Sequence, residues 1–155
     1  MIRTVGRGLL AGAAGTTALN VVTYADMALR GRPTSSAPET TVSRLADLVG
    51  RPVPGDDEHR GNRLSGLGAL SGLLVGTGAG AVAAVTRRAG LRLPVWLGGV
   101  LTGALVMAAT DAPMAGLKVS DPRTWSATDW VSDAVPHLVH GLVTYAAVVA
   151  YEDRR

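Results

Sequence analysis

Four long apolar segments, separated by polar stretches, dominate the pattern of hydrophobic positions along the chain. They cover residues 8–29, 64–85, 94–111 and 135–151. Each approaches or exceeds the roughly 17 to 20 residues that a helix needs to cross the hydrocarbon layer of a membrane. Helices of a soluble protein would show a polar face with a period of 3.6 residues, and the second and third segments have almost none. The pattern therefore predicts an all-α integral membrane protein, a four-helix bundle in which all four segments cross the bilayer.

The apolar residues are mostly small. Hydrophobic residues make up 47% of the chain with no Phe among them, and Gly occurs 20 times in 155 residues. Small residues let helix backbones approach closely, which is how helices associate in lipid. In the second segment, glycines recur every four residues and would form a groove for a helix of the same bundle or, if the groove faces outward, for a homo-oligomer or a partner membrane subunit. These glycines are Gly68, Gly72, Gly76 and Gly80.

The first apolar segment has a second interpretation. Because Arg3 and Arg7 precede it, it also resembles a secretory signal peptide. No convincing small-x-small cleavage site follows, and a similar segment recurs later in the chain. We therefore expect the segment to stay in the protein as a crossing helix.

The distribution of charge predicts the topology. Lys and Arg total 15 against 12 Asp and Glu, which gives a net charge of +3. The basic residues lie at the edges of the apolar segments, so anchoring in a membrane explains them better than nucleic-acid binding does. Both termini and the loop after the second segment are short and basic, whereas the other two connections are longer and mix both signs. By the positive-inside rule, we expect a multi-pass protein of the inner (plasma) membrane with both termini in the cytoplasm.

The start of the chain aligns with its third apolar segment. Residues 8–20 (GLLAGAAGTTALN) over residues 99–111 (GVLTGALVMAATD) pair Gly8 with Gly99 and Gly12 with Gly103. The same alignment pairs Asn20 with Asp111. We interpret this as two repeats, residues 1–90 and 91–155, although small-residue segments also align by chance. Because each unit contains two crossings, the repeats would be parallel and related by an axis along the membrane normal.

The alignment extends into the two longer connections. Ser36 and Glu39 in the first, like Ser126 and Asp129 in the second, form the capping-box pattern that satisfies free amides where a helix begins. We therefore expect a short helix at the membrane surface in each outer loop, over residues 37–49 and 127–135. Trp125 and Trp130 suit the headgroup region there.

These features together resemble a family of bacterial inner-membrane proteins, the YagU-like proteins. The matching residues are GLLAGA (8–13), GVLTGA (99–104) and the sequence His137-Leu138-Val139 at the last helix. The resemblance covers most of the chain, which departs from the family by Pro136 before the His and by a shorter first loop. It implies duplicated small-residue helices and a role in acid tolerance or envelope physiology, with no established reaction.

Asp111 is an acidic residue near the end of an apolar run. A carboxylate in hydrocarbon costs about 3 kcal/mol and is normally wetted, turned inward or paired. Pro113 removes a backbone donor two residues later, so we expect the helix to end close to Asp111. Two interpretations remain open: Asp111 is wetted by the outer headgroups, or it faces Asn20 across the pseudo-axis and accepts its amide.

The fourth segment carries a polar stripe. Asp133, His137, His140 and Thr144 are spaced i, i+4, i+7 and i+11 on one helical face. We expect Asp133 to be the N-cap, with Pro136 in the first turn and both imidazoles near the positive end of the helix dipole, which keeps them neutral. Hydrogen bonding to the third helix, proton sensing, and a divalent-metal site shared with Asp111 are the three alternatives.

These observations favour some function classes over others. The absence of Cys excludes thiolate chemistry, and no complete catalytic constellation or cofactor motif is present, so we expect no enzymatic activity and no cofactor. The polar cluster of Asn20, Asp111 and the stripe favours proton- or ion-linked transport or a role in acid or envelope stress. The alternative is a noncatalytic accessory or scaffold subunit of a larger membrane complex.

Overall fold

The computed structural model describes residues 1–153, and these form five α-helices with no β-strand. In chain order they are α1 (Ile2–Arg30), α2 (Ala37–Leu48), α3 (Asp57–Arg88), α4 (Val95–Gly116) and α5 (Ala127–Asp153). A single 3-10 turn, η1 (Pro122–Thr124), lies between α4 and α5. The predicted all-α fold is confirmed.

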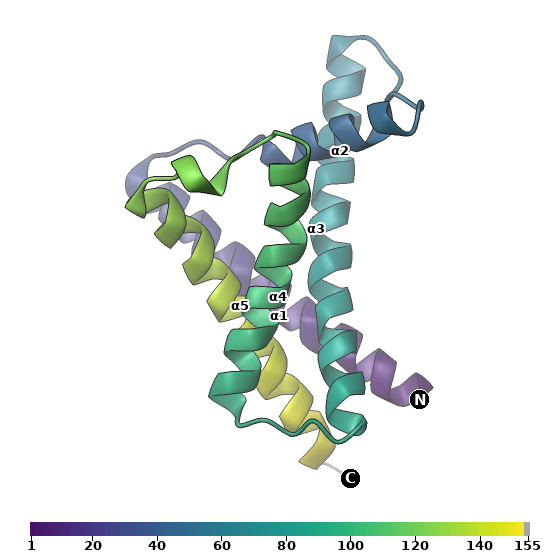
Figure 1. The fold of residues 1–155 in the computed structure, drawn as a ribbon, viewed down its shortest axis with the longest axis vertical. Helices are drawn as coiled ribbons and strands as arrows, with labels where there is room; N and C mark the ends of the chain where they lie inside the picture. The colour runs from purple at the N-terminus through teal and green to yellow at the C-terminus, as the bar shows by residue number, and fades with distance from the viewer. Residues whose placement is uncertain (154–155) are drawn as a thin grey trace.

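The four long helices form a bundle with two distinct ends (Figure 1). α1 packs against α3 and α5, whereas α4 packs mainly against α5. The N-terminus, the connection between α3 and α4 and the end of α5 lie together, and we call this the basic end. The connections that contain α2 and η1 lie at the opposite end, the loop end, where α2 packs across α3.

Two prolines lie inside helices, where the sequence predicted helix ends or starts, so two predicted helix bounds are wrong. α4 does not end near Asp111 but continues through Pro113 to Gly116. The surface helix expected over residues 127–135 is not a separate element, because α5 runs through Pro136 without a break. Each proline removes only one backbone hydrogen bond, and helices in membranes tolerate this where neighbouring helices support them.

The helix starts also differ from those expected. In α5 the capping box forms: the Asp129 amide donates to Ser126 Oγ over 3.2 Å, and Ser126 N donates to Asp129 Oδ2 over 2.9 Å. Asp133 is therefore inside α5 rather than its N-cap, and both imidazoles lie far from the positive helix end. In α2, which begins where predicted, Ser36 makes no side-chain cap and Glu39 instead accepts from Ser65 of α3.

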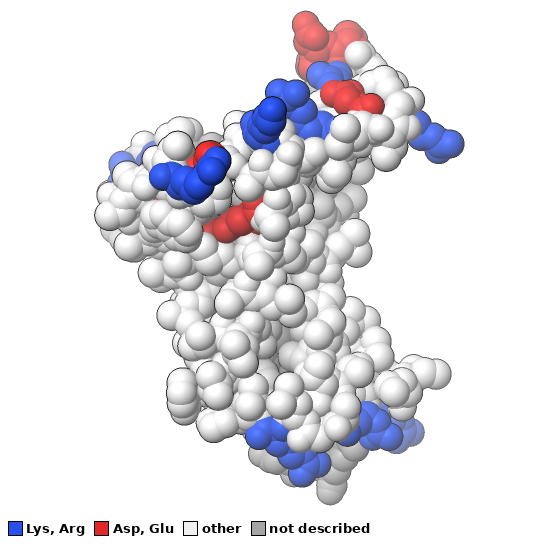
Figure 2. Space-filling model, viewed as in Figure 1, with Lys and Arg blue, Asp and Glu red and all other residues white. Residues whose placement is uncertain are grey.

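Three helices are long and apolar enough to cross a membrane: α3, α4 and α5. The side chains are distributed as in a membrane protein, with large apolar residues such as Leu74 and Leu101 exposed and polar residues such as His140 buried. Figure 2 shows an uncharged belt between a basic end and a loop end of mixed charge. The chain is thus a helical membrane protein, with these three candidate spans among residues 1–153; α1, although 29 residues long, does not meet the same criterion of an apolar window.

Glycines set close helix contacts at two places, and they do so in the same way. A Cβ on Gly80 of α3 would strike the backbone of Gly8 and Gly12 on α1. A Cβ on Gly141 of α5 would strike the backbone of the corresponding pair on α4, Gly99 and Gly103. In each pair of helices, the two backbones therefore touch where one glycine packs between two glycines of the neighbouring helix.

Candidate functional site: a carboxyl pair between two crossing helices

Two acidic side chains meet where α4 packs against α5, toward the loop end. Asp111 is 9% exposed, and its carboxyl group lies beside that of Asp133. Thr110 adds a weak contact, because its hydroxyl donates to Asp111 Oδ1 over 3.4 Å. Because α4 continues past Pro113, Asp111 lies more than a turn inside the helix and is turned toward α5.

His137 lies one turn along α5 from Asp133. Its Nδ1 is 2.8 Å from the backbone oxygen of Asp133 and 3.5 Å from the carboxylate oxygen Oδ1. A carbonyl oxygen only accepts, so Nδ1 carries the hydrogen and Nε2 is the basic nitrogen of the neutral ring. We call Asp111, Asp133 and His137 the carboxyl site.

The two stripe residues nearer the basic end, His140 and Thr144, do not face α4. His140 and Thr144 are fully buried, and they contact α1 at Gly15 and α3 at Gly76 rather than α4. The four stripe residues do share one face of α5, as their spacing predicts. Because α5 crosses its neighbours at an angle, that face meets α4 toward the loop end. Toward the basic end it meets α1 and α3.

Asn20 is not brought to the carboxyl site. The side chain is half-buried on α1 and makes no side-chain hydrogen bond within the described part of the chain, and α1 has little contact with α4. The expected pairing of its amide with Asp111 is therefore not formed. Asp111 has Asp133 as its partner instead.

The residues weighed as metal ligands do not form a metal centre. Over residues 1–153, no group of three or more His, Asp and Glu side chains is arranged to hold a metal ion. His137 and His140, three residues apart, have different neighbours: His137 lies beside Asp133, and His140 lies beside glycines of α1 and α3. Asp111, His137 and His140 therefore do not converge on one point.

The glycine groove of α3 is filled by the chain itself. Gly76 and Gly80 contact α1, and Gly68 contacts Pro38 of α2, where a Cβ would come within 3.1 Å of the proline Cβ. Gly72 differs, because a Cβ there would meet no atom within 4 Å among the described residues. Most of the groove is thus an internal packing surface.

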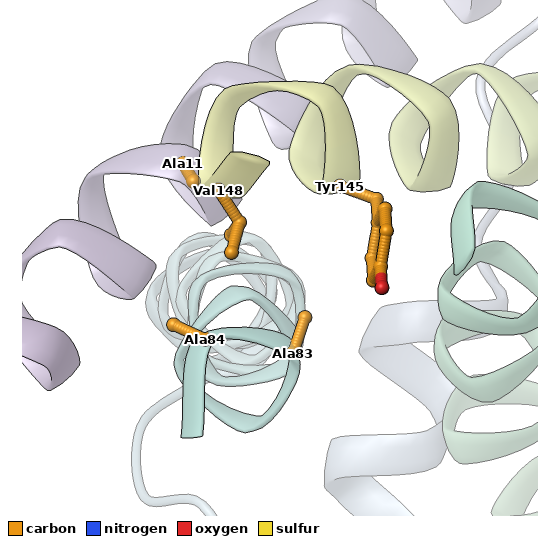
Figure 3. Packing of buried hydrophobic residues seen from close by; sticks show 5 residues of the cluster. All are labelled: Ala11, Ala83, Ala84, Tyr145 and Val148. Carbon is orange, nitrogen blue, oxygen red and sulfur yellow. The ribbon is translucent and has the colours of Figure 1, made fainter. Parts of the chain in front are cut away.

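A buried ionic network at the basic end was not anticipated from the sequence. Arg87 is 7% exposed; its Nη1 donates to Tyr145 Oη over 2.9 Å, and its Nη2 lies 3.1 Å from Glu152. The Leu93 amide also donates to Tyr145 Oη, over 3.1 Å, which ties the connection between α3 and α4 to α5. Figure 3 shows Tyr145 extending from α5 beside α3, in the same packed cluster as Ala11, Ala84 and Val148. Nothing in the sequence distinguishes Arg87 from its exposed neighbour Arg88.

A hollow of about 340 Å³ lies between the loop-end halves of α1 and α5. The polar side chains that line the hollow pair with one another. Arg30 lies 3.2 Å from Asp26 Oδ1 and donates to Ser132 over 2.6 Å. It lies on the face of α5 opposite the polar stripe, so it is separate from the carboxyl site.

Two exposed acidic groups near the loop end, Asp56 and Asp121, are paired locally. The backbone amide and the ring of His59 lower the pKa of Asp56, which caps α3. The side chain of Arg123, 2.8 Å away, lowers the pKa of Asp121 at η1. These exposed groups serve as helix and turn caps, which leaves the carboxyl site as the candidate for proton chemistry.

The chain was compared with protein-family models, with curated proteins and with solved structures, and no match was found in any of them. The resemblance to the YagU-like proteins therefore stays a prediction from the sequence motifs.

Proposed function

We propose that this chain is a small multi-pass protein of the inner membrane that binds protons at the carboxyl site and carries them through the bilayer. The observation that supports this is the contact between Asp111 and Asp133. Two carboxyl groups can hydrogen-bond to each other only if one of them carries a proton. In an apolar layer such a pair is a proton-binding site, and His137 is a neighbouring group that can exchange that proton.

The proposed path requires a complete four-helix crossing, so we include α1 among the membrane helices. α1 has 29 residues and packs along α3 and α5, both of which are apolar enough to cross. Its two ends lie at the two ends of the bundle (Figure 1). The basic end would face the cytoplasm, because positive residues are retained on that side.

The proposal also includes two parallel repeats with helices α1 and α3 in the first and α4 and α5 in the second. Its support is the matched contact of Gly80 with Gly8 and Gly12, and of Gly141 with Gly99 and Gly103. The carboxyl site has no counterpart in the first repeat. On this proposal it is a specialisation of the second repeat, residues 91–155.

A role in acid tolerance, which the resemblance to the YagU-like proteins implies, is compatible with proton binding. The alternative function is that of a noncatalytic accessory subunit in a larger membrane complex or a homo-oligomer. It would need a docking surface other than the groove of α3, since Gly76 and Gly80 contact α1. We therefore favour proton transfer.

Reconstitution tests this function directly. Purified protein is placed in liposomes that enclose a pH-sensitive dye, and an imposed pH difference is followed with choline in place of Na⁺. We expect wild-type protein to dissipate the difference faster than empty liposomes do, and Asp111→Asn to abolish this. Asp57→Asn, an exposed acid in the first turn of α3, is the matched control and should behave as wild type. Wild-type liposomes that match empty ones would refute the proposal.

A further inference from the structure

The most deeply buried ionisable side chain outside the carboxyl site is His140. It is 0% exposed, and although the backbone of Gly76 lies close to its ring, neither ring nitrogen makes a hydrogen bond of good geometry among the described residues. Thr144 Oγ1, one turn along α5, is equally buried and equally unpartnered within residues 1–153. Buried polar groups are almost always hydrogen-bonded, so a cluster of unpaired ones calls for a functional explanation.

Two other helices make room for this cluster with glycine. A Cβ on Gly15 of α1 would strike Thr144 Oγ1 and come within 3.2 Å of His140 Cδ2. A Cβ on Gly76 of α3 would strike Thr16 Oγ1 and come within 3.1 Å of His140 Nε2. Any larger residue at either position would fill the space in front of the imidazole.

The position of His140 along α5 connects two polar regions. Toward the loop end, His137 is three residues away and belongs to the carboxyl site. Toward the basic end, Thr144 is followed by Tyr145, whose hydroxyl meets Arg87. His140 thus lies between the proton-binding carboxyls and the buried network that ends at the partly exposed Glu152.

Few titratable groups lie near His140. On its own helix the nearest ionisable group is His137. The groups that face it from α1 and α3 are glycine and threonine, namely Gly15, Thr16 and Gly76. Within the described residues, His137 is therefore the titratable group nearest to His140 along α5.

We propose that His140 is a relay residue that receives protons from the carboxyl site by way of His137 and releases them toward the basic end. The inference rests on the proposed function. A neutral imidazole accepts a proton at one ring nitrogen and gives up the proton bound to the other, so each transfer ends with a neutral ring and one proton moved. The Thr144 hydroxyl both donates and accepts, and it extends this chain by one turn.

The test compares proton flux with proton binding in the same variant. His140→Gln keeps a polar side chain of similar reach but cannot hold a positive charge. In the liposome assay we expect it to slow proton flux about a hundredfold or more, at the lower end of what a positioned acid–base group contributes. The pH titration of the carboxylic C=O stretch, followed by infrared spectroscopy, should still report the Asp111–Asp133 pair. His59→Gln, the same change at an exposed His, is the matched control and should conduct as wild type.

The outcomes separate the inference from the function on which it rests. If wild-type protein conducts no protons, the proposed function fails. If wild-type protein and His140→Gln conduct equally, the proposed function stands and the relay is refuted. Should His140→Gln fail to insert, Thr144→Val takes its place, since it keeps the shape and removes only the hydroxyl. Flux through Thr144→Val equal to wild type would then overturn the relay, and slowed flux with an intact carboxyl titration would support it.

Discussion

At the basic end of the bundle, one buried cation connects the backbone between α3 and α4 with two side chains of α5. Arg87 binds the hydroxyl of Tyr145, the carboxylate of Glu152 and, over 3.3 Å, the backbone oxygen of Leu93. Its guanidinium carbon also lies 5.1 Å from the centre of the Tyr145 ring, a cation–π arrangement. A planar guanidinium with several fixed donors can make all these contacts at once, whereas an ammonium group cannot.

Replacing Arg87 should therefore destabilise the fold. We expect Arg87→Met to lower the free energy of unfolding by about 3 kcal/mol, because it leaves the partly buried Glu152 without its cation and Tyr145 without a donor. Arg87→Lys should recover part of the loss by restoring charge without the planar fork. Arg88→Met, at the exposed neighbour, should change little. Denaturant unfolding in detergent micelles measures all three, and equal stability of the two Met variants would contradict the role of Arg87.

Individual residues were predictable to different degrees. An inward-facing Asp111 was one of two interpretations that the cost of a carboxylate in hydrocarbon left open, the other being a carboxylate wetted by the headgroups. The partner of Asp111 did not follow from the sequence, because the repeat alignment indicated Asn20 and the packing angles of the helices instead bring Asp133 to it. Arg87 could not be separated from Arg88 by sequence, since which of two adjacent arginines points inward depends on the helix rotation that packing sets.

At the scale of elements, hydrophobic patterning predicted which segments are helical but not where the helices end. Pro113 and Pro136 both lie inside helices, although each was expected at or near a helix start or end. Proline rules derive from water, where a freed carbonyl and a frayed end are hydrated at little cost. In an apolar layer a broken helix would expose further backbone groups, so continuing the helix is the less costly choice.

The matched glycine contacts predict matched effects of substitution. Gly80→Ala and Gly141→Ala should each destabilise the fold by roughly 1 to 3 kcal/mol, because the added methyl meets backbone atoms that cannot move without separating two helices. Gly72→Ala, in open surroundings, should be neutral or stabilise by up to about 1 kcal/mol through helix propensity.

Thermal unfolding in detergent compares these three variants side by side. The contrast between Gly80→Ala and Gly72→Ala tests whether the groove of α3 faces inward. Similar losses for Gly80→Ala and Gly141→Ala support the equivalence of the two helix pairs. If Gly72→Ala were the most damaging change, the groove would serve a partner outside the chain instead.

At the scale of the whole molecule, the bundle places small and polar residues inside and large apolar residues outside. Its buried residues include Gly76, Thr144 and Arg87, whereas Leu70 and Leu74 of α3 are 55% and 72% exposed. Composition alone predicted this, because a chain rich in Gly and Ala with few large core residues suits lipid as a solvent. The order of contacts among the four helices was not predictable, since it depends on crossing angles that the hydrophobic pattern does not encode.

The absence of native cysteine makes the topology directly measurable by labelling single-cysteine variants. Ile2→Cys and Arg92→Cys are exposed positions at the basic end, and Thr34→Cys and Arg123→Cys are exposed positions at the loop end. A membrane-impermeant maleimide applied to intact spheroplasts should label only the loop-end pair, because the shorter, more basic connections stay in the cytoplasm. All four should react after lysis. Opposite labelling of positions 2 and 34 would show that α1 crosses the bilayer. Labelling of both positions from the same side would place α1 outside the hydrocarbon layer and leave three crossing helices.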